Sequence, residues 1–69
     1  MKFSAKNVFL GKVTRLAPVA AGIEVTLELP GGIELVSNVT KIAAKNLGLK
    51  KGDEIYAVIK ASNVMLATE

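Results

Sequence analysis

The sequence of 69 residues contains no cysteine and no histidine. These absences exclude a disulfide scaffold, a thiolate nucleophile, the usual ligands of a structural zinc site and an imidazole acid or base. Only six residues are acidic, and three of these alternate with apolar residues along extended segments, as on the solvated face of a strand. These carboxylates could in principle form a catalytic pair or a site for a hard cation, but the solvated strand face is the preferred interpretation, so we expect a protein that is not an enzyme and binds no metal cation directly.

Long apolar runs are also absent, although apolar residues are abundant. No run approaches the roughly 20 residues of a membrane span, and the first residues do not lead into the apolar stretch of a signal peptide, so we expect a cytoplasmic protein that does not contact a membrane. Apolar residues make up 51% of the chain. A folded chain of this size exposes roughly 4,100 Å² and buries only about 60% of its extended surface. We therefore expect one domain, residues 1–69, that associates with copies of itself.

Basic residues outnumber acidic ones. Nine lysine and arginine residues against six acidic residues give a net charge of +3, and the isoelectric point is near 9.5. This balance favours an anionic partner. The charge alone does not distinguish between a nucleic acid, an inorganic oxyanion and an acidic protein as that partner. An equal alternative is that the net charge serves only to keep the protein soluble.

A β-hairpin is the clearest local pattern. In residues 23–29 four apolar side chains alternate with three polar ones, which is typical of a half-buried strand. Pro30, Gly31 and Gly32 interrupt this pattern, and alternation resumes over residues 33–40. Because so short a glycine-rich connection favours antiparallel neighbours, the two segments are predicted to form a hairpin.

The remaining elements are predicted from shorter signals. Residues 8–16 form a first strand in which Gly11 indicates a bulge or a close backbone approach, and residues 17–22 connect it to the hairpin. Thr40 is the predicted N-cap of a helix over residues 41–46, and Gly48 its C-terminal residue. Residues 49–53 form a turn. Two more strands follow over residues 54–60 and 64–67, and the first of these is apolar on both faces, as in a central strand or one pressed against another subunit.

Five short strands and one short helix predict a mainly β fold. The arrangement is typical of a small antiparallel barrel like the oligonucleotide/oligosaccharide-binding (OB) fold.

Three short polar clusters lie just outside the predicted strands. Each combines hydroxyl or amide donors with an ammonium group, and none contains a carboxylate, which suits an inert anion better than a reacting substrate. The helix start adds backbone N–H groups and the positive end of a helix dipole. The alternative is that the hydroxyl groups only cap and turn the backbone. The clusters are Ser4-Ala5-Lys6-Asn7, Thr40-Lys41 and Lys60-Ala61-Ser62-Asn63.

Several short motifs, in order over nearly the whole chain, resemble the molybdenum-pterin-binding proteins, also called the Mop or molbindin group, which consist of a single TOBE/Mop-type domain. The motifs are Ser4-Ala5-Lys6-Asn7 with Gly11-Lys12-Val13, then Val39-Thr40, then Leu47-Gly48-Leu49 with Gly52, and finally the run from Ala57 to Met65. This resemblance implies an OB-like barrel and assembly as a homohexamer, a trimer of dimers. It also implies binding of molybdate or tungstate between subunits, for molybdenum storage and homeostasis in the cytoplasm.

The resemblance also assigns the binding residues by position. It implies a tetrahedral dianion held by residues of two subunits, with lysine charge and with hydroxyl and main-chain donors. Two positions depart from the family pattern, because Lys6 stands where many members have arginine and Ala43 where some have serine. The free oxyanion is the expected ligand rather than a pterin, since few aromatic side chains are present to stack on a pterin. The implied binding residues are Ser4, Ala5, Lys6, Asn7, Thr40, Lys60, Ala61 and Ser62.

Two other functions compete with oxyanion binding. Residues 39–60 also resemble the swapped-hairpin DNA-binding regulators of the AbrB type, although the first half of the chain does not. An OB fold that binds single-stranded nucleic acid is the second alternative, and the aromatic residues it would stack on bases are Phe3, Phe9 and Tyr56. Neither nucleic acid nor a membrane is an expected partner if the oxyanion interpretation holds.

Overall fold

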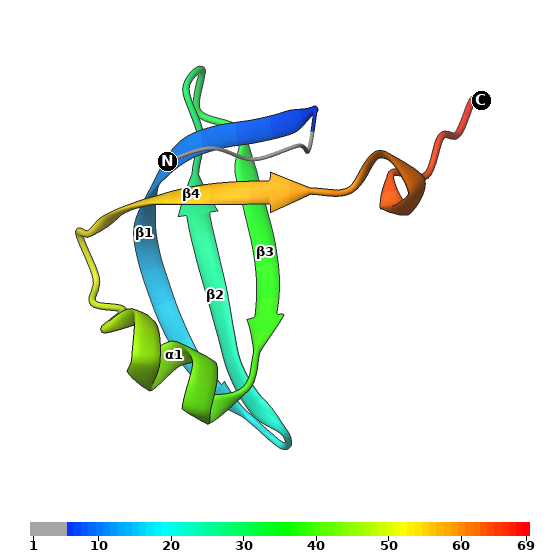
Figure 1. Ribbon diagram of the computed structural model, residues 1–69. Coiled ribbons are helices and arrows are strands. Elements are labelled where there is room, and N and C mark those ends of the chain that lie inside the picture. The colour runs from blue at the N-terminus through cyan, green and yellow to red at the C-terminus, as the bar shows by residue number, and fades with distance from the viewer. Residues whose placement is uncertain (1–5) are drawn as a thin grey trace.

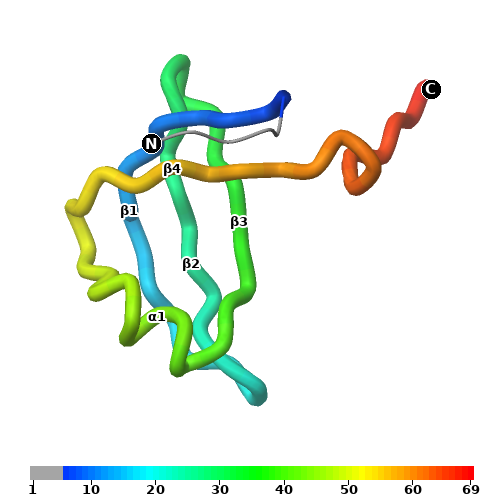
Figure 2. The backbone as a smooth tube through the Cα atoms, viewed as in Figure 1, coloured from blue at the N-terminus to red at the C-terminus, as the bar shows by residue number. Residues whose placement is uncertain are grey.

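The computed structural model describes residues 6–69. In this part of the chain four strands form one antiparallel sheet in the order β3-β2-β1-β4. The sheet curls so that β4 crosses over β2 and β3, the helix lies at one end, and the C-terminal residues extend away from the body (Figures 1 and 2). The elements are β1 (Asn7–Val19), β2 (Gly22–Glu28), β3 (Glu34–Val39), α1 (Lys41–Leu47), β4 (Glu54–Ile59) and the 3-10 turn η1 (Ala61–Asn63).

The long strand β1 holds the two halves of the sheet together. Its residues 12–19 pair with β2, and its residues 7–12 pair with β4. Gly11 lies where these pairings meet, and a Cβ atom there would come within 2.9 Å of Leu29 Cδ2 and 3.3 Å of the Glu28 carbonyl oxygen. The predicted close approach at Gly11 is therefore confirmed, while the irregularity in register falls a little later, between Val13 and Arg15.

The predicted connection over residues 17–22 is wrong, because β1 continues to Val19 and the turn is confined to Ala20 and Ala21. Pro18 lies inside the strand, opposite Ile23 of β2. The pairing of β1 with β4 stops at Lys12, so the other side of β1 has no sheet neighbour at Pro18 among residues 6–69. Since proline lacks a backbone N–H, this unpaired side is where a strand tolerates it.

The hairpin and the helix follow the predictions from sequence. Leu29 N donates to the Ile33 carbonyl oxygen at 2.7 Å, closing the connection between β2 and β3. The hydroxyl oxygen of Thr40 accepts a hydrogen bond of 3.0 Å from Ala43 N, so Thr40 is the N-cap of α1. Gly48 ends the helix at φ 63°, in the left-handed region that glycine adopts without strain. No helix within residues 6–69 combines the length and the apolar character needed to cross a membrane.

The predicted fifth strand is wrong for the single chain. Residues 64–69 follow η1 without pairing to the sheet, and Met65 and Leu66 are each 93% exposed. A strand needs the N–H and C=O groups of a neighbour, and the tail in this conformation has none among the described residues. The sheet therefore has four strands, and within residues 6–69 β3 and β4 are its edges.

The core is small and the apolar surface is large. Five apolar residues are buried in the described part of the chain: Val13, Val25, Leu27, Leu29 and Ala57. Twelve large apolar side chains are exposed, and the accessible surface is 5653 Å², well above the roughly 4,100 Å² of a compact chain of this size. The chain thus leaves more large apolar side chains exposed than it buries within the described residues.

Candidate functional site

The sheet register brings two of the three polar clusters together. Asn7 is the partner of Ile59 in the pairing of β1 with β4, and its side-chain amide donates to the Ile59 carbonyl oxygen at 3.3 Å. Asn7 and Ile59 are the last pair of this register, and they are directly adjacent in the sequence to Lys6 and Lys60. Both lysines are exposed. We call Lys6, Asn7, Lys60, Ala61 and Ser62 the β1–β4 cluster.

The turn η1 adds main-chain donors to the β1–β4 cluster. Asn63 N donates to the Lys60 carbonyl oxygen at 2.9 Å, and Val64 N donates to the Ala61 carbonyl oxygen at 3.3 Å. The N–H groups of Ala61 and Ser62 donate to no main-chain acceptor within residues 6–69. The residues next to the last pair of β1 and β4 therefore include two lysines, two main-chain donors and the Ser62 hydroxyl, which are the kinds of group that bind an anion. The remaining predicted residues of this cluster, Ser4 and Ala5, lie outside the described residues.

The third cluster, Thr40-Lys41, contains one hydroxyl group. Thr40 uses its hydroxyl oxygen to cap α1 by accepting from Ala43 N, but its hydroxyl proton remains available to an external acceptor. Thr40 and Lys41 are both exposed. Thr40 therefore caps the helix, as the alternative interpretation of this cluster expected. The cap uses the hydroxyl oxygen as an acceptor and does not use the O–H group as a donor.

Thr40 lies far from the β1–β4 cluster within one chain. It follows Val39, which pairs with Ile23, and Ile23 pairs with Pro18 near the last residue of β1. Lys6 precedes the first residue of the same strand, 13 residues long. Figures 1 and 2 show the start of β1 and the start of α1 at opposite ends of the molecule. A single chain therefore does not bring all predicted binding residues around one small ion.

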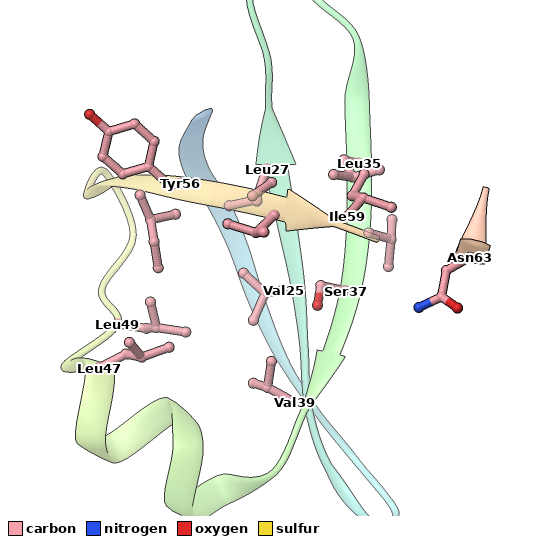
Figure 3. A pocket seen from close by; sticks show the side chains of 14 residues that line it. Val25, Leu27, Leu35, Ser37, Val39, Leu47, Leu49, Tyr56, Ile59 and Asn63 are labelled. Carbon is pink, nitrogen blue, oxygen red and sulfur yellow. The ribbon is translucent and has the colours of Figure 1, made fainter. Parts of the chain in front are cut away.

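An apolar groove lies between the two sheet edges. It has a volume of about 450 Å³, and we call it the β3–β4 groove. Leu35 and Val39 of β3, Ile59 of β4 and Leu49 point into it (Figure 3). No lysine or arginine lines this groove, so a dianion placed there would lose its hydration without gaining a counter-charge. The sequence indicated this surface only through the two-sided apolar pattern of residues 54–60.

No group of three or more acidic residues within residues 6–69 is placed to hold a metal ion. The chemistry that the described residues offer is that of cations and neutral donors at the ends of the sheet.

Comparison with known proteins gives a consistent set of similarities. The TOBE domain family matches residues 4–66. The chain is 41% identical over 69 residues to a protein of Haemophilus influenzae named as a probable molybdenum-pterin-binding protein, and the match covers the whole of both sequences. It is 44% identical over 69 residues to the molybdenum transport protein ModE of Azotobacter vinelandii, of which it spans only 26%.

Two solved structures share the fold. MopII from Clostridium pasteurianum superimposes with a TM-score of 0.90 at 36% identity, over 97% of this chain and 100% of MopII. The cytoplasmic molybdate-binding protein ModG, in a crystal form with molybdate bound, superimposes with a TM-score of 0.87 at 49% identity. That match covers 94% of this chain and 46% of ModG.

Proposed function

Because the chain belongs to the TOBE domain family and is similar along its whole length to molybdenum-pterin-binding proteins, we propose that it binds molybdate. Its role is to store and buffer molybdenum in the cytoplasm, without catalysis. The observation that supports the proposal is the register of β1 and β4, whose last pair, Asn7 and Ile59, is followed by Lys6 on one side and by Lys60 and η1 on the other.

The donor set fits a tetrahedral dianion. Two ammonium groups balance its charge, while the Ser62 hydroxyl and the N–H groups of Ala61 and Ser62 bond to its oxygens. Ser4, Ala5 and Asn7 complete this side of the proposed site. Fixed donors select by size, because a smaller oxyanion leaves some of them unpaired. Molybdate and tungstate are nearly equal in size and are expected to bind alike, whereas sulfate is smaller and binds weakly.

Two copies of the chain are needed for the complete site. Thr40 belongs to the proposed donor set, yet in one chain it lies at the opposite end of β1 from Lys6 and Lys60. The Thr40 that completes a site is therefore supplied by a neighbouring subunit. Binding at an interface between subunits follows from this division of the donors.

Self-association as a homohexamer, a trimer of dimers, is part of the proposal. The accessible surface of 5653 Å² and the twelve exposed large apolar side chains support it. The excess of roughly 1,500 Å² over a compact chain is about twice the roughly 800 Å² that a standard interface buries on each partner.

The competing functions have less support. The AbrB-type resemblance left the first half of the chain unexplained, whereas the TOBE match includes residues 4–66. Nucleic-acid binding is not proposed further, and a gel shift with random oligonucleotides is expected to be negative at physiological salt.

Native mass spectrometry of the purified protein with molybdate, tungstate or sulfate tests the proposal. We expect a hexamer that takes up several molybdate or tungstate ions and no sulfate. A monomer or dimer without uptake of either metal oxyanion would refute it. Equal uptake of sulfate would refute the selectivity by size while leaving general anion binding.

A further inference from the structure

A small apolar depression lies between α1 and the ends of β1 and β2 that their turn joins (Figure 1). It has a volume of about 240 Å³, and we call it the α1 depression. Two exposed lysines, Lys41 and Lys45, line it together with four apolar residues. Because residues four apart on a helix lie on the same side, the two lysines are neighbours. The apolar lining residues are Leu16, Ile23, Ala44 and Leu49.

The segment that contains α1 carries positive charge only. Residues 40–52 include four lysines and no acidic residue, and all four lysines are exposed. Asp53 is the first acidic residue after this segment, and its Oδ2 atom accepts a hydrogen bond of 3.0 Å from Lys50 N. Its carboxylate therefore serves the turn before β4. A partner of the segment is expected to carry negative charge.

The size of the α1 depression favours a side chain of a protein over a free small molecule. Pockets for drug-sized ligands measure about 300–1,000 Å³, and the α1 depression is smaller. One apolar side chain fits such a space, while carboxylates beside it form charge-assisted hydrogen bonds with the two lysines. Single-stranded nucleic acid is less suitable, because its bases stack on aromatic side chains, and none of the described residues that line the depression is aromatic.

We propose that the α1 depression binds an acidic segment of a partner protein. One apolar side chain of this segment lies in the depression, and carboxylates on either side of it pair with Lys41 and Lys45. Lys50 and Lys51 do not line the depression, but they add to the long-range attraction of an acidic chain. This binding does not depend on molybdate.

The position of the α1 depression connects partner binding to release of the ion. Lys41 directly follows Thr40, which belongs to the proposed oxyanion site. Adjacent residues lie about 3.8 Å apart, well within the Debye length of about 8 Å at physiological ionic strength. Carboxylates paired with Lys41 therefore repel a dianion held by Thr40, so the partner favours unloading of molybdate. This consequence rests on the proposed function.

Fluorescence anisotropy with labelled synthetic peptides tests the binding of an acidic segment to the full chain without molybdate. The probe peptide has one leucine with two aspartates on each side. A comparison peptide has serine in place of the leucine and is expected to bind about tenfold more weakly, because it has no apolar side chain to bury. Binding of the probe is also expected to weaken as salt is added.

Two lysine variants locate the binding surface. Lys45→Gln removes a charge from the depression and keeps a good helix former, and the affinity for the probe peptide is expected to fall by about fivefold to tenfold. The matched control is Lys12→Gln, because Lys12 is an exposed lysine of β1 that does not line the depression. This control is expected to bind the probe peptide as the parent does.

Three results would overturn the binding of an acidic segment. Equal losses in the two lysine variants would mean that net charge attracts the peptide. Equal binding of the leucine and serine peptides would mean that no apolar side chain enters the depression. Tighter binding of a single-stranded oligonucleotide or of phosphatidylserine vesicles than of the probe peptide would assign the surface to nucleic acid or to a membrane.

Titration of molybdate with and without saturating probe peptide tests the connection to the ion. We expect the peptide to lower the affinity for molybdate by about threefold to tenfold, and molybdate to weaken peptide binding by the same factor. Unchanged affinity for molybdate with the peptide bound would refute the effect on release. A protein that binds the probe peptide as expected but takes up no molybdate would refute the proposed function alone.

Discussion

The two ends of β1 carry different chemistry, although one strand holds both in place. At the Asn7 end, Lys6 and Lys60 lie next in the sequence to the last pair of β1 and β4. At the Val19 end the sheet leads to Thr40, a neutral hydroxyl that already caps α1. One end thus carries positive charge and the other carries a fixed neutral donor. Under the proposed function, each end is half of a site that a neighbouring copy completes.

The largest expected effect comes from placing charge at the neutral end. Thr40→Asp keeps an N-cap residue, because aspartate caps helices at least as well as threonine. Its carboxylate repels the dianion, so molybdate affinity is expected to fall by about a thousandfold. Isothermal titration calorimetry measures the affinity. The control Thr40→Ser retains both the cap and the hydroxyl donor and is expected to bind within a few-fold of the parent. A Thr40→Asp protein with parental affinity would place Thr40 outside the site.

A substitution at the charged end of β1 is expected to lower the affinity for molybdate by less than Thr40→Asp does. Lys60→Ala removes one charge-assisted hydrogen bond, and the affinity for molybdate is expected to fall by about a hundredfold. The hexamer is expected to remain in native mass spectrometry. Lys51→Ala, at an exposed lysine in the turn before β4, is the matched control and should bind as the parent does. Equal losses in the two variants would mean that net charge, and not position, attracts the ion.

The middle of β1 fixes the distance between the two ends. Gly11→Ala introduces a Cβ atom at 2.9 Å from Leu29 Cδ2 and 3.3 Å from the Glu28 carbonyl oxygen. This crowding is expected to lower the free energy of unfolding by about 1–3 kcal/mol, as measured by urea denaturation. The folded fraction should still bind molybdate. A variant as stable as the parent would show that β1 and β2 separate at Gly11 without cost.

The smallest effect is expected from exchanging lysine for arginine at position 6. Lys6→Arg replaces a point charge by a planar group that donates two parallel bonds. The second hydrogen bond is expected to raise the affinity for molybdate. The increase is expected to be only about threefold to tenfold, because this bond is exposed to solvent. Titration calorimetry again gives the value. Weaker binding would indicate that the longer arginine side chain does not fit beside Lys60.

The sequence predicted those features that depend on neighbouring residues. The hairpin followed from alternation and from Pro30 to Gly32, and the ends of α1 from Thr40 and Gly48, because turns and caps are set by local backbone chemistry. The connection at residues 17–22 was wrongly predicted, since β1 continues through Pro18 to Val19. Among the described residues, the other side of β1 has no neighbour at Pro18, a circumstance that only the sheet topology reveals.

The sequence predicted the kinds of residue in the candidate site, but it did not predict which of the three clusters lie together in one chain. The clusters were found from residue types, yet which clusters meet depends on pairing between residues far apart in the sequence, such as Asn7 and Ile59. The fifth strand failed for a similar reason. The apolar pattern of residues 64–67 is that of a strand, but a strand forms only against a neighbour, and the single chain offers none in the described conformation.

Complementation between two deficient chains tests the divided site most directly. The Thr40→Asp chain retains Lys60, and the Lys60→Ala chain retains Thr40, so each alone is expected to bind molybdate poorly. When the two chains are unfolded together and refolded at equal amounts, about a quarter of the parental sites should return with parental affinity, as random pairing of two chains predicts. If no sites return although mixed oligomers form, both half-sites come from one chain, and the division of the site between subunits is wrong.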